Sequence, residues 1–282
     1  MKVLVLGGGG REHALVWKLK QSPRITHLYC ASGNGGIADE AECLPADLKS
    51  LDSMVALAKR LQPDLTVVGP ELPLTMGVVD EFMRRGWRVF GPTQAAARLE
   101  SSKSFAKEFL QRHHIPTAPF AICDSVDQVR AALAHFHTPV VVKADGLAAG
   151  KGVVIAKNKE EAASVAAEML SGKMLGEAGS RVVLEECLQG DELSFLVFSD
   201  GERVAPLVGA QDHKRVGDGD TGPNTGGMGC FSPVPEGEAL VETAIRTVHQ
   251  PVVDELARRG TPFHGVLYAG LMIAPGGAIK VL

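Results

Sequence analysis

Two lysines bracket a loop of small residues near the middle of the chain, and together they could hold phosphate groups. Lys143 ends an apolar, β-branched run, and a loop rich in glycine and alanine follows it as far as Lys151-Gly152. Such a loop can close over phosphates, while its backbone N–H groups and the lysines offset their charge. It is not a P-loop, because only three residues separate Gly146 from Gly150 and Gly152 stands where Ser or Thr would meet magnesium. A flexible surface loop is the alternative.

A second glycine-rich segment, Gly7-Gly8-Gly9-Gly10, lies between the first apolar run and the first helical pattern and is followed by Arg11 and Glu12. Backbone N–H groups at a helix N-terminus can bind an anion, and Arg11 adds a positive charge. The dinucleotide-binding fingerprint would need a third glycine at the position of Glu12. The segment therefore predicts a site for a substrate phosphate or carboxylate and not for a nicotinamide. A tight turn that requires glycine is the alternative.

Carboxylates follow two other apolar runs. Glu71 comes after Leu65–Val68, at the edge where open α/β sheets usually bind ligands, and could bind an amine or a ribose hydroxyl. The segment Glu185–Glu192 comes after a run that begins at Arg181. Backbone groups at such an exit could read the edge of an adenine, and a later carboxylate could accept both ribose hydroxyls. Solvated loop carboxylates are the alternative in both places.

A polar segment from Gln211 to Gly229 separates two apolar runs and combines charged residues with many glycines. This composition predicts a ligand-binding loop with many backbone donors. We assign no proton-transfer role to His213, and no Ser-His-Asp arrangement can be defended from the sequence.

Alternating strand and helix patterns must position these residues. Strands are expected at Lys2–Leu6, His27–Cys30, Leu65–Val68 and Val89–Phe90, and helices at Glu12–Gln21, Ser50–Leu61 and Gly77–Gly86. This alternation predicts an α/β fold with a parallel sheet wrapped by helices. A helix over Lys103–Gln111 and the linker His113–Pro119, where prolines break regular structure, precede a second α/β unit.

The second unit is expected to contain strands at Val140–Lys143, Val153–Ala156 and Arg181–Glu185. Ser125 and Asn158 should cap helices, with Gln128 and Glu161 at the spacing of a capping box. The rest combines strands at Leu193–Ser199, Val266–Ile273 and Ile279–Leu282 with a helix near Glu238–Arg259. The predicted domains are 1–102, 103–192 and 193–282.

Composition restricts the class of protein. The 282 residues are 45% apolar and 22% charged, and the formal net charge of −4 is spread without long blocks. This balance is typical of globular proteins and gives no broad attraction to nucleic acid or to an anionic membrane. The five cysteines are scattered, and no run approaches the roughly 20 apolar residues that cross a bilayer. We expect a cytoplasmic protein with small-molecule partners.

Taken in order, the motifs resemble those of the glycinamide ribonucleotide synthetase (phosphoribosylamine–glycine ligase) family of ATP-grasp enzymes. The resemblance covers essentially the whole chain. It includes the segments above and Val68-Gly69-Pro70-Glu71, Phe90-Gly91-Pro92-Thr93, Ser102-Lys103, Gly222-Pro223-Asn224-Thr225-Gly226-Gly227-Met228-Gly229 and Leu267-Tyr268-Ala269-Gly270-Leu271-Met272. It implies a Rossmann-like N-terminal domain followed by an ATP-grasp fold of two α+β lobes, the second incomplete.

The resemblance also implies a reaction of purine biosynthesis, in which ATP phosphorylates glycine and the amine of phosphoribosylamine attacks the acyl phosphate. The implied catalytic residues are Lys143, Asp212 and Lys214. The residues implied to bind ATP are Lys103, Lys143, Gly146, Gly150, Lys151, Gly152, Glu185, Glu186, Leu188 and Glu192. The residues implied to bind substrate are Gly8, Gly9, Gly10, Arg11, Glu71, Asp212, Lys214, Asn224, Thr225, Gly226 and Gly227. Backbone groups of Glu186 and Leu188 would flank the adenine, and Glu192 would hold the ribose.

The chain departs from the family's pattern after Lys280-Val281-Leu282, where the family continues into a Glu-x-Asn motif that binds magnesium or manganese. The expected metal ligands would thus lie beyond Leu282. We expect this chain to be a monomer that binds nucleotide weakly and is inactive or nearly so by itself, since magnesium needs near-octahedral oxygen coordination. Three alternatives remain: another ATP-grasp ligase or carboxylase, a nicotinamide-dependent oxidoreductase, and a non-catalytic nucleotide-binding module.

Overall fold

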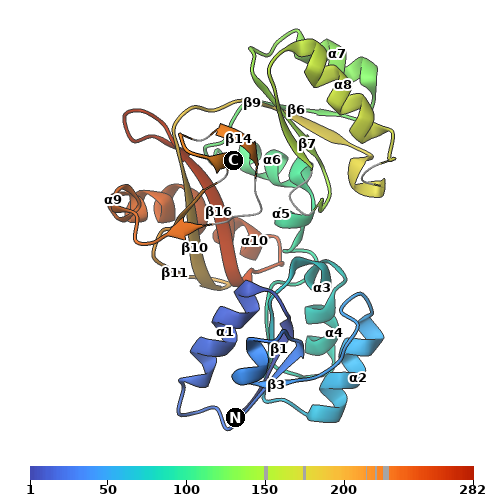
Figure 1. Ribbon diagram of the computed structural model, residues 1–282, viewed down its shortest axis with the longest axis vertical. Helices are drawn as coiled ribbons and strands as arrows, with labels where there is room; N and C mark the ends of the chain where they lie inside the picture. The colour runs from blue at the N-terminus through green and yellow to red at the C-terminus, as the bar shows by residue number, and fades with distance from the viewer. Residues whose placement is uncertain (149–151, 174–175, 214, 220, 225–228) are drawn as a thin grey trace. The chain divides into compact units, whose positions relative to one another are not determined.

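The computed structural model describes residues 1–282 except 149–151, 174–175, 214, 220 and 225–228. The chain forms two compact units, each with its own sheets and helices (Figure 1). The first unit comprises Met1–Arg98 and Leu256–Gly265, and the second comprises Leu99–Glu255 and Val266–Leu282.

The first unit is built on a five-stranded parallel sheet with the strand order β3-β2-β1-β4-β5. Its strands are β1 (Lys2–Gly7), β2 (His27–Ser32), β3 (Glu42–Cys43), β4 (Leu65–Val68) and β5 (Val89–Phe90). Its helices are α1 (Gly10–Lys20), the 3-10 turn η1 (Ile37–Asp39), α2 (Leu51–Leu61), α3 (Glu71–Thr75) and α4 (Val78–Arg84). The predicted parallel sheet is confirmed, whereas β3 and α3 were not predicted.

Side chains of β1 alternate between two cores on opposite faces of this sheet. Leu4 and Leu6 pack with Met54 of α2, whereas Val5 packs with Val16 of α1. Because neighbouring residues of a strand point to opposite faces, a strand covered by helices on both sides has no polar positions. This burial on both faces explains the uninterrupted apolar run with which the chain begins.

The second unit contains two four-stranded sheets, with the orders β6-β9-β7-β8 and β11-β10-β16-β17. The strands of the first sheet are β6 (Phe120–Cys123), β7 (Val140–Ala144), β8 (Val153–Ala156) and β9 (Val182–Glu186). Those of the second are β10 (Asp191–Asp200), β11 (Val204–Pro206), β16 (His264–Ile273) and β17 (Ile279–Val281). Two small sheets pair β12 (Gln211–Asp212) with β15 (Cys230–Phe231) and β13 (Arg215–Gly217) with β14 (Thr221–Asn224). They lie where the sequence predicted one long loop.

The remaining helices include one correction. They are α5 (Arg98–Ser101), α6 (Lys103–Arg112), α7 (Val126–Leu133), α8 (Lys159–Leu170), the 3-10 turn η2 (Gly176–Gly179), α9 (Pro235–Ala244), the π-helical turn η3 (Ile245–His249) and α10 (Gln250–Arg258). The prediction of a single helix near Glu238–Arg259 is therefore wrong, because a π-helical turn separates two α-helices there. The pattern of apolar residues does not distinguish a π-bulge from regular helix.

Helices α7 and α8 begin at the predicted caps. Ser125 Oγ accepts a hydrogen bond of 3.3 Å from the N–H of Gln128, and Asn158 Oδ1 accepts one of 2.8 Å from the N–H of Glu161. The side chains of Gln128 and Glu161 reach one residue further back than a capping box requires, to the N–H group that precedes each cap. Both helices pack on the β6-β9-β7-β8 sheet through a shared apolar core (Figure 1).

Candidate functional site

In the first unit, the glycine turn lies where the strand order changes direction. β1 is flanked by β2 and β4, and in such sheets ligands bind outside the carboxyl ends of the strands at this switch point. A Cβ atom on Gly8 would collide with the carbonyl oxygen of Gly33, in the loop after β2. Asn34 of the same loop, which the sequence analysis missed, donates from Nδ2 to the carbonyl oxygen of Gly8 at 2.9 Å. The turn therefore needs glycine for close packing and also lies where a ligand is expected.

Glu12 fills the space beneath this turn. Its side chain folds back from the first turn of α1, and Oε2 accepts a hydrogen bond of 2.6 Å from the N–H of Gly9. The residue is 4% exposed, and a Cβ atom on Gly69 would collide with its carboxylate. Dinucleotide-binding turns use a glycine at this position to bring helix and strand together. Here a buried carboxylate takes that place and occupies one N–H group of the turn, which disfavours the nicotinamide alternative.

Arg11 and Glu71 meet across the switch point. Arg11 Nη1 donates to Glu71 Oε1 at 2.8 Å and to the carbonyl oxygen of Gly69 at 3.0 Å. Glu71 is the first residue of α3, so the alternative of a solvated loop carboxylate is wrong about the loop, although the side chain is 39% exposed. An acidic side chain in the first turn complements the helix dipole. The structure thus brings together the glycine turn, Arg11 and Glu71, which were all predicted to bind substrate.

In the second unit, two lysines share one buried carboxylate oxygen. Glu185 Oε2 on β9 lies 2.9 Å from Lys143 Nζ on β7 and 2.8 Å from Lys107 Nζ on α6. The Glu185 side chain is 2% exposed, which excludes a solvated loop carboxylate at this position. Lys107 was missed by the sequence analysis. The available signal was its position four residues after Lys103, on the same face of the helix predicted there.

Lys103 connects α6 to the start of the small-residue loop. Its Nζ donates to the carbonyl oxygen of Gly146 at 3.0 Å, and its backbone N–H donates to that of Asp145 at 3.0 Å. Asp145 Oδ1 also accepts a hydrogen bond of 2.6 Å from the N–H of Ser104. Burial lowers the pKa of the Lys103 amine below its ordinary value. The beginning of the loop is therefore fixed to the N-terminal turn of α6.

Several predicted site residues lie outside the described part of the chain: Gly150, Lys151, Lys214, Thr225, Gly226 and Gly227. Gly152 is described, and its carbonyl oxygen accepts the N–H of Ala144 at 2.8 Å, which closes the base of the loop. Asp212 lies on β12 and Asn224 ends β14, so these two predicted substrate contacts belong to different two-stranded sheets.

The residues expected around an adenine follow β9. Glu186 donates its N–H to the carbonyl oxygen of Pro119 at 3.0 Å, which ties the end of β9 to the linker before β6. Leu188 and Glu192 are half-buried, and Glu192 lies within β10. The contacts of these residues with adenine and ribose stay predictions.

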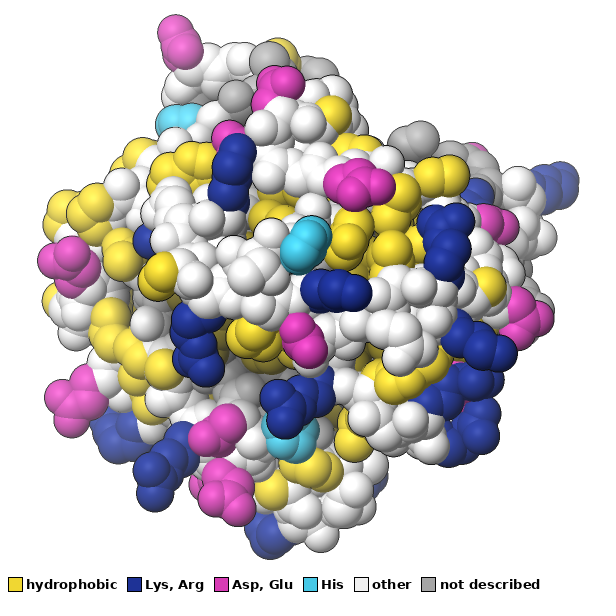
Figure 2. Space-filling model, turned by 90° about the horizontal axis from the view of Figure 1, so that it is seen from below, with side chains coloured by type: hydrophobic (Ala, Val, Ile, Leu, Met, Phe, Trp, Pro, Cys, Tyr) yellow, Lys and Arg dark blue, Asp and Glu magenta, His cyan; other side chains and the backbone are white. Residues whose placement is uncertain are grey.

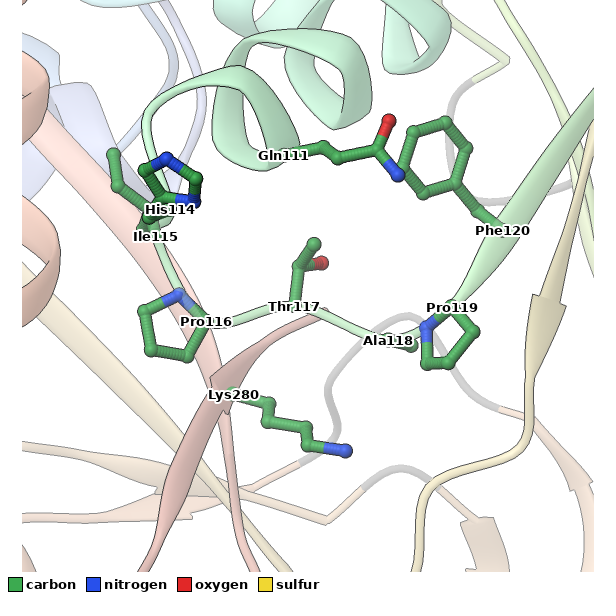
Figure 3. Close-up of a pocket in the computed structure, with 9 residues that line it drawn as sticks. All are labelled: Gln111, His114, Ile115, Pro116, Thr117, Ala118, Pro119, Phe120 and Lys280. Carbon is green, nitrogen blue, oxygen red and sulfur yellow. The ribbon is translucent and has the colours of Figure 1, made fainter.

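A pocket of about 500 Å³ opens along the linker between α6 and β6. It is lined by Gln111, His114, Ile115, Pro116, Thr117, Ala118, Pro119, Phe120 and Lys280 (Figure 3). Thr117 Oγ1 accepts a hydrogen bond of 2.7 Å from Lys107 Nζ and donates one of 2.8 Å to the carbonyl oxygen of Val281. Although no predicted site residue lines the pocket, Thr117 connects its wall to the Lys107–Glu185 ion pair.

Among the described residues, no group of three or more His, Cys, Asp or Glu side chains could hold a metal ion. No helix in the same part of the chain is long and apolar enough to cross a membrane. Acidic and basic side chains are interspersed over the face shown in Figure 2.

A Rossmann-like parallel sheet, followed by a unit whose lysines lie at the base of a small-residue loop, defines an ATP-grasp protein. Residues 1–100 match the family model "Phosphoribosylglycinamide synthetase, N domain". Residues 101–282 match the model "Phosphoribosylglycinamide synthetase, ATP-grasp (A) domain". The chain belongs to the phosphoribosylglycinamide synthetase family.

Curated relatives and solved structures agree with this assignment. The phosphoribosylamine–glycine ligase of Xanthomonas axonopodis pv. citri (strain 306) is 54% identical over 285 residues, which cover 100% of this chain and 66% of the relative. The crystal structure of phosphoribosylamine–glycine ligase from Thermotoga maritima matches with a TM-score of 0.86 and 32% identity, covering 100% of this chain and 68% of that one. A biotin carboxylase from Campylobacter jejuni shares the fold, with a TM-score of 0.75 and 15% identity over 99% of this chain and 64% of that one. The chain spans about 66% of the length of the first curated relatives.

Proposed function

We propose that this chain takes part in the ATP-dependent ligation of glycine to 5-phosphoribosylamine through glycyl phosphate, giving glycinamide ribonucleotide, ADP and phosphate in purine biosynthesis. The observation that carries the proposal is the grouping of Lys103 and Lys143 at the anchored start of the loop at Gly146. The choice of substrates is supported by the family and by relatives whose names state this reaction.

In the first step, a carboxylate oxygen of glycine attacks the γ-phosphorus of ATP, and the bond from that phosphorus to the bridging oxygen of ADP breaks. Lys103 and Lys143 hold the phosphates and offset their charge, which matters most as charge moves during phosphoryl transfer. The loop Gly146–Gly152 covers the phosphates and excludes water, which would otherwise hydrolyse the acyl phosphate. Backbone groups of Glu186 and Leu188 flank the adenine, and Glu192 holds the ribose.

In the second step, the amine nitrogen of phosphoribosylamine attacks the acyl carbon of glycyl phosphate, phosphate leaves, and the nitrogen loses a proton. The N-terminal turn of α1 and Arg11 suit the phosphate of phosphoribosylamine, because N–H groups and a guanidinium both favour an anion. Glu71 suits a ribose hydroxyl or the amine. Asp212 and Lys214 are proposed to act on the reacting groups, with the Asn224–Gly227 segment contributing further substrate contacts.

The ATP-grasp family implies a divalent metal, which would supply positive charge to the phosphates. No group of described side chains fits a metal site, so no step is assigned to a metal within this chain. We propose magnesium or manganese as that metal. The domain division 1–102, 103–192 and 193–282, the cytoplasmic location and the monomeric state are likewise proposals from the sequence.

The test is phosphate release from ATP with glycine and phosphoribosylamine, with each reactant omitted in turn. It is run on this chain and on a chimera extended to the full length of the Xanthomonas relative. We expect release only from the extended chain and only with both substrates. If the extended chain binds ATP but releases no phosphate, a nucleotide-binding module is favoured; release with a different carboxylate or amine favours another ATP-grasp ligase.

A further inference from the structure

One carboxylate oxygen in the second unit has two cationic partners, and the two partners differ. Glu185 Oε2 accepts from Lys107 Nζ at 2.8 Å and from Lys143 Nζ at 2.9 Å. Lys107 is 3% exposed, whereas Lys143 is 13% exposed and lies at the end of β7, next to the loop that begins at Asp145. Two ammonium groups against one carboxylate leave an excess of positive charge, which suits an anion.

Lys107 is held from a second side. Its Nζ also donates to Thr117 Oγ1 at 2.7 Å, and that hydroxyl donates to the carbonyl oxygen of Val281 at 2.8 Å. Burial lowers the pKa of the Lys107 amine, and the Glu185 carboxylate opposes this effect. Lys143 Nζ, in contrast, has one hydrogen bond to a described residue, the contact with Glu185. Lys107 is therefore fixed in place, and Lys143 is the partner that can leave.

The difference matters once a nucleotide binds. If Lys143 were the sole counter-ion of Glu185, moving its ammonium group to a phosphate would leave a buried carboxylate without a partner. Breaking a buried ion pair in this way is strongly unfavourable, because the remaining charge is desolvated and uncompensated. Phosphate would then have to compete with Glu185 for the same lysine. A second, permanent counter-ion removes this competition.

We propose that Lys107 is a positioning residue that remains paired with Glu185 and so frees Lys143 to bind a nucleotide phosphate. The inference rests on the proposed function, because it takes the phosphates of ATP as the ligand of Lys143. It assigns a role to a lysine that need not contact the nucleotide itself. Loss of Lys107 should therefore weaken the affinity for ligands that carry phosphate groups and leave the affinity for the nucleoside alone unchanged.

The test is titration calorimetry of this chain with ADP and with adenosine, before and after Lys107→Met. We expect the variant to lose about tenfold or more in ADP affinity while its adenosine affinity stays within about twofold of wild type. Lys157→Met, which removes an exposed lysine preceding α8, is the charge-matched control and should leave both affinities unchanged. Equal ADP affinity in wild type and Lys107→Met overturns the proposal, as does an equal loss for ADP and adenosine.

A second variant keeps the test decisive if Lys107→Met does not fold. In the Glu185→Gln background no buried carboxylate remains to hold Lys143, so we expect Lys107→Met to change ADP affinity by less than about twofold relative to Glu185→Gln alone. A further tenfold loss of ADP affinity from Glu185→Gln to the folded double variant Lys107→Met/Glu185→Gln overturns the proposal. If wild type binds neither ligand, the nucleotide site of the proposed function itself is absent, and this inference falls with it.

Discussion

Glu12 shows how one side chain changes the chemistry of a glycine turn. Its carboxylate accepts a hydrogen bond of 2.6 Å from the N–H of Gly9 and fills the space beside Gly69, so the turn stays tight although Glu12 stands where the dinucleotide-binding fingerprint has its third glycine. An anion at this turn must therefore use the other N–H groups and Arg11.

Lys143 and Lys107 both form an ion pair with the Glu185 carboxylate, but their side chains differ in exposed fraction and in their other partners.

We expect Glu12→Ala to destabilise the first unit by about 1–3 kcal/mol, because the N–H of Gly9 loses a charged acceptor in a buried place. Both tryptophans, Trp17 and Trp87, belong to this unit, so urea unfolding followed by tryptophan fluorescence reports on it. Glu42→Ala, at an exposed position of β3, is the control and should change the free energy of unfolding by less than about 0.5 kcal/mol. Equal stability of the two variants would contradict a structural role for Glu12.

Residue types could be read from the sequence better than residue partners. The missing third glycine at Glu12 was visible, and so was Lys143 before a small-residue loop. The inward turn of Glu12 was not visible, because it depends on Gly69, which follows a different strand. Lys107 was missed for the same reason, since its importance comes from Glu185, 78 positions later in the numbering.

At the scale of elements, capping residues and sheet register place the functional side chains. Lys143 and Glu185 can meet because β7 and β9 are antiparallel neighbours in which Val141 is paired with Glu185, two residues before Lys143. Most of the longer strands and helices in both units followed from periodicity and caps, whereas β3, α3 and β6 were not predicted. The short strands β12 to β15 were also missed, because their mostly polar residues carry too little pattern to separate them from a polar loop.

Loss of the cap at the start of α8 should loosen that helix. We expect Asn158→Ala to cost about 1 kcal/mol, because the N–H of Glu161 loses its side-chain acceptor. Hydrogen exchange of the α8 amides should become about fivefold faster where exchange proceeds through opening of that helix. Asn158→Asp keeps an acceptor and is the matched control; identical exchange in Asn158→Ala and wild type would show that the cap contributes nothing.

His249, in the π-helical turn, makes stability depend on pH. The residue is fully buried, and desolvation lowers the pKa of its imidazole below 6.5, with a backbone contact from Nδ1 to the carbonyl oxygen of Ala244 opposing this effect. Between the lowered folded pKa and 6.5, the unfolded state binds more protons than the folded state. The stability that neutral His249 provides is therefore complete above pH 6.5 and is lost as the pH falls through the folded pKa.

The expected loss below pH 6.5 is at most about 1.4 kcal/mol per pH unit from this group. Urea unfolding followed by far-UV circular dichroism at pH 7.5 and 5.5 measures it, with His249→Gln as the variant that cannot titrate. The variant should lose less stability over this interval than wild type. Equal pH dependence of the two proteins would show that His249 does not carry the effect.

At the scale of the whole molecule, two units with separate cores each carry some of the predicted binding residues. The first presents a glycine turn at the switch point of a parallel sheet, and the second holds lysines at the base of a small-residue loop. The order of motifs along the chain was sufficient to predict the family and its fold class. No local sequence pattern indicates that Leu256–Gly265 belongs to the first unit, because this membership depends on contacts between residues far apart in the sequence.

Direct titration tests whether the second unit binds ATP through Lys143. The chain is titrated with ATP and with NADH by calorimetry, in parallel with Lys143→Met and the exposed-lysine control Lys157→Met. We expect saturable binding of ATP but not of NADH, a loss of about tenfold or more in ATP affinity in Lys143→Met, and no change in the control. Unchanged ATP affinity in Lys143→Met, or binding of NADH in preference to ATP, would contradict it.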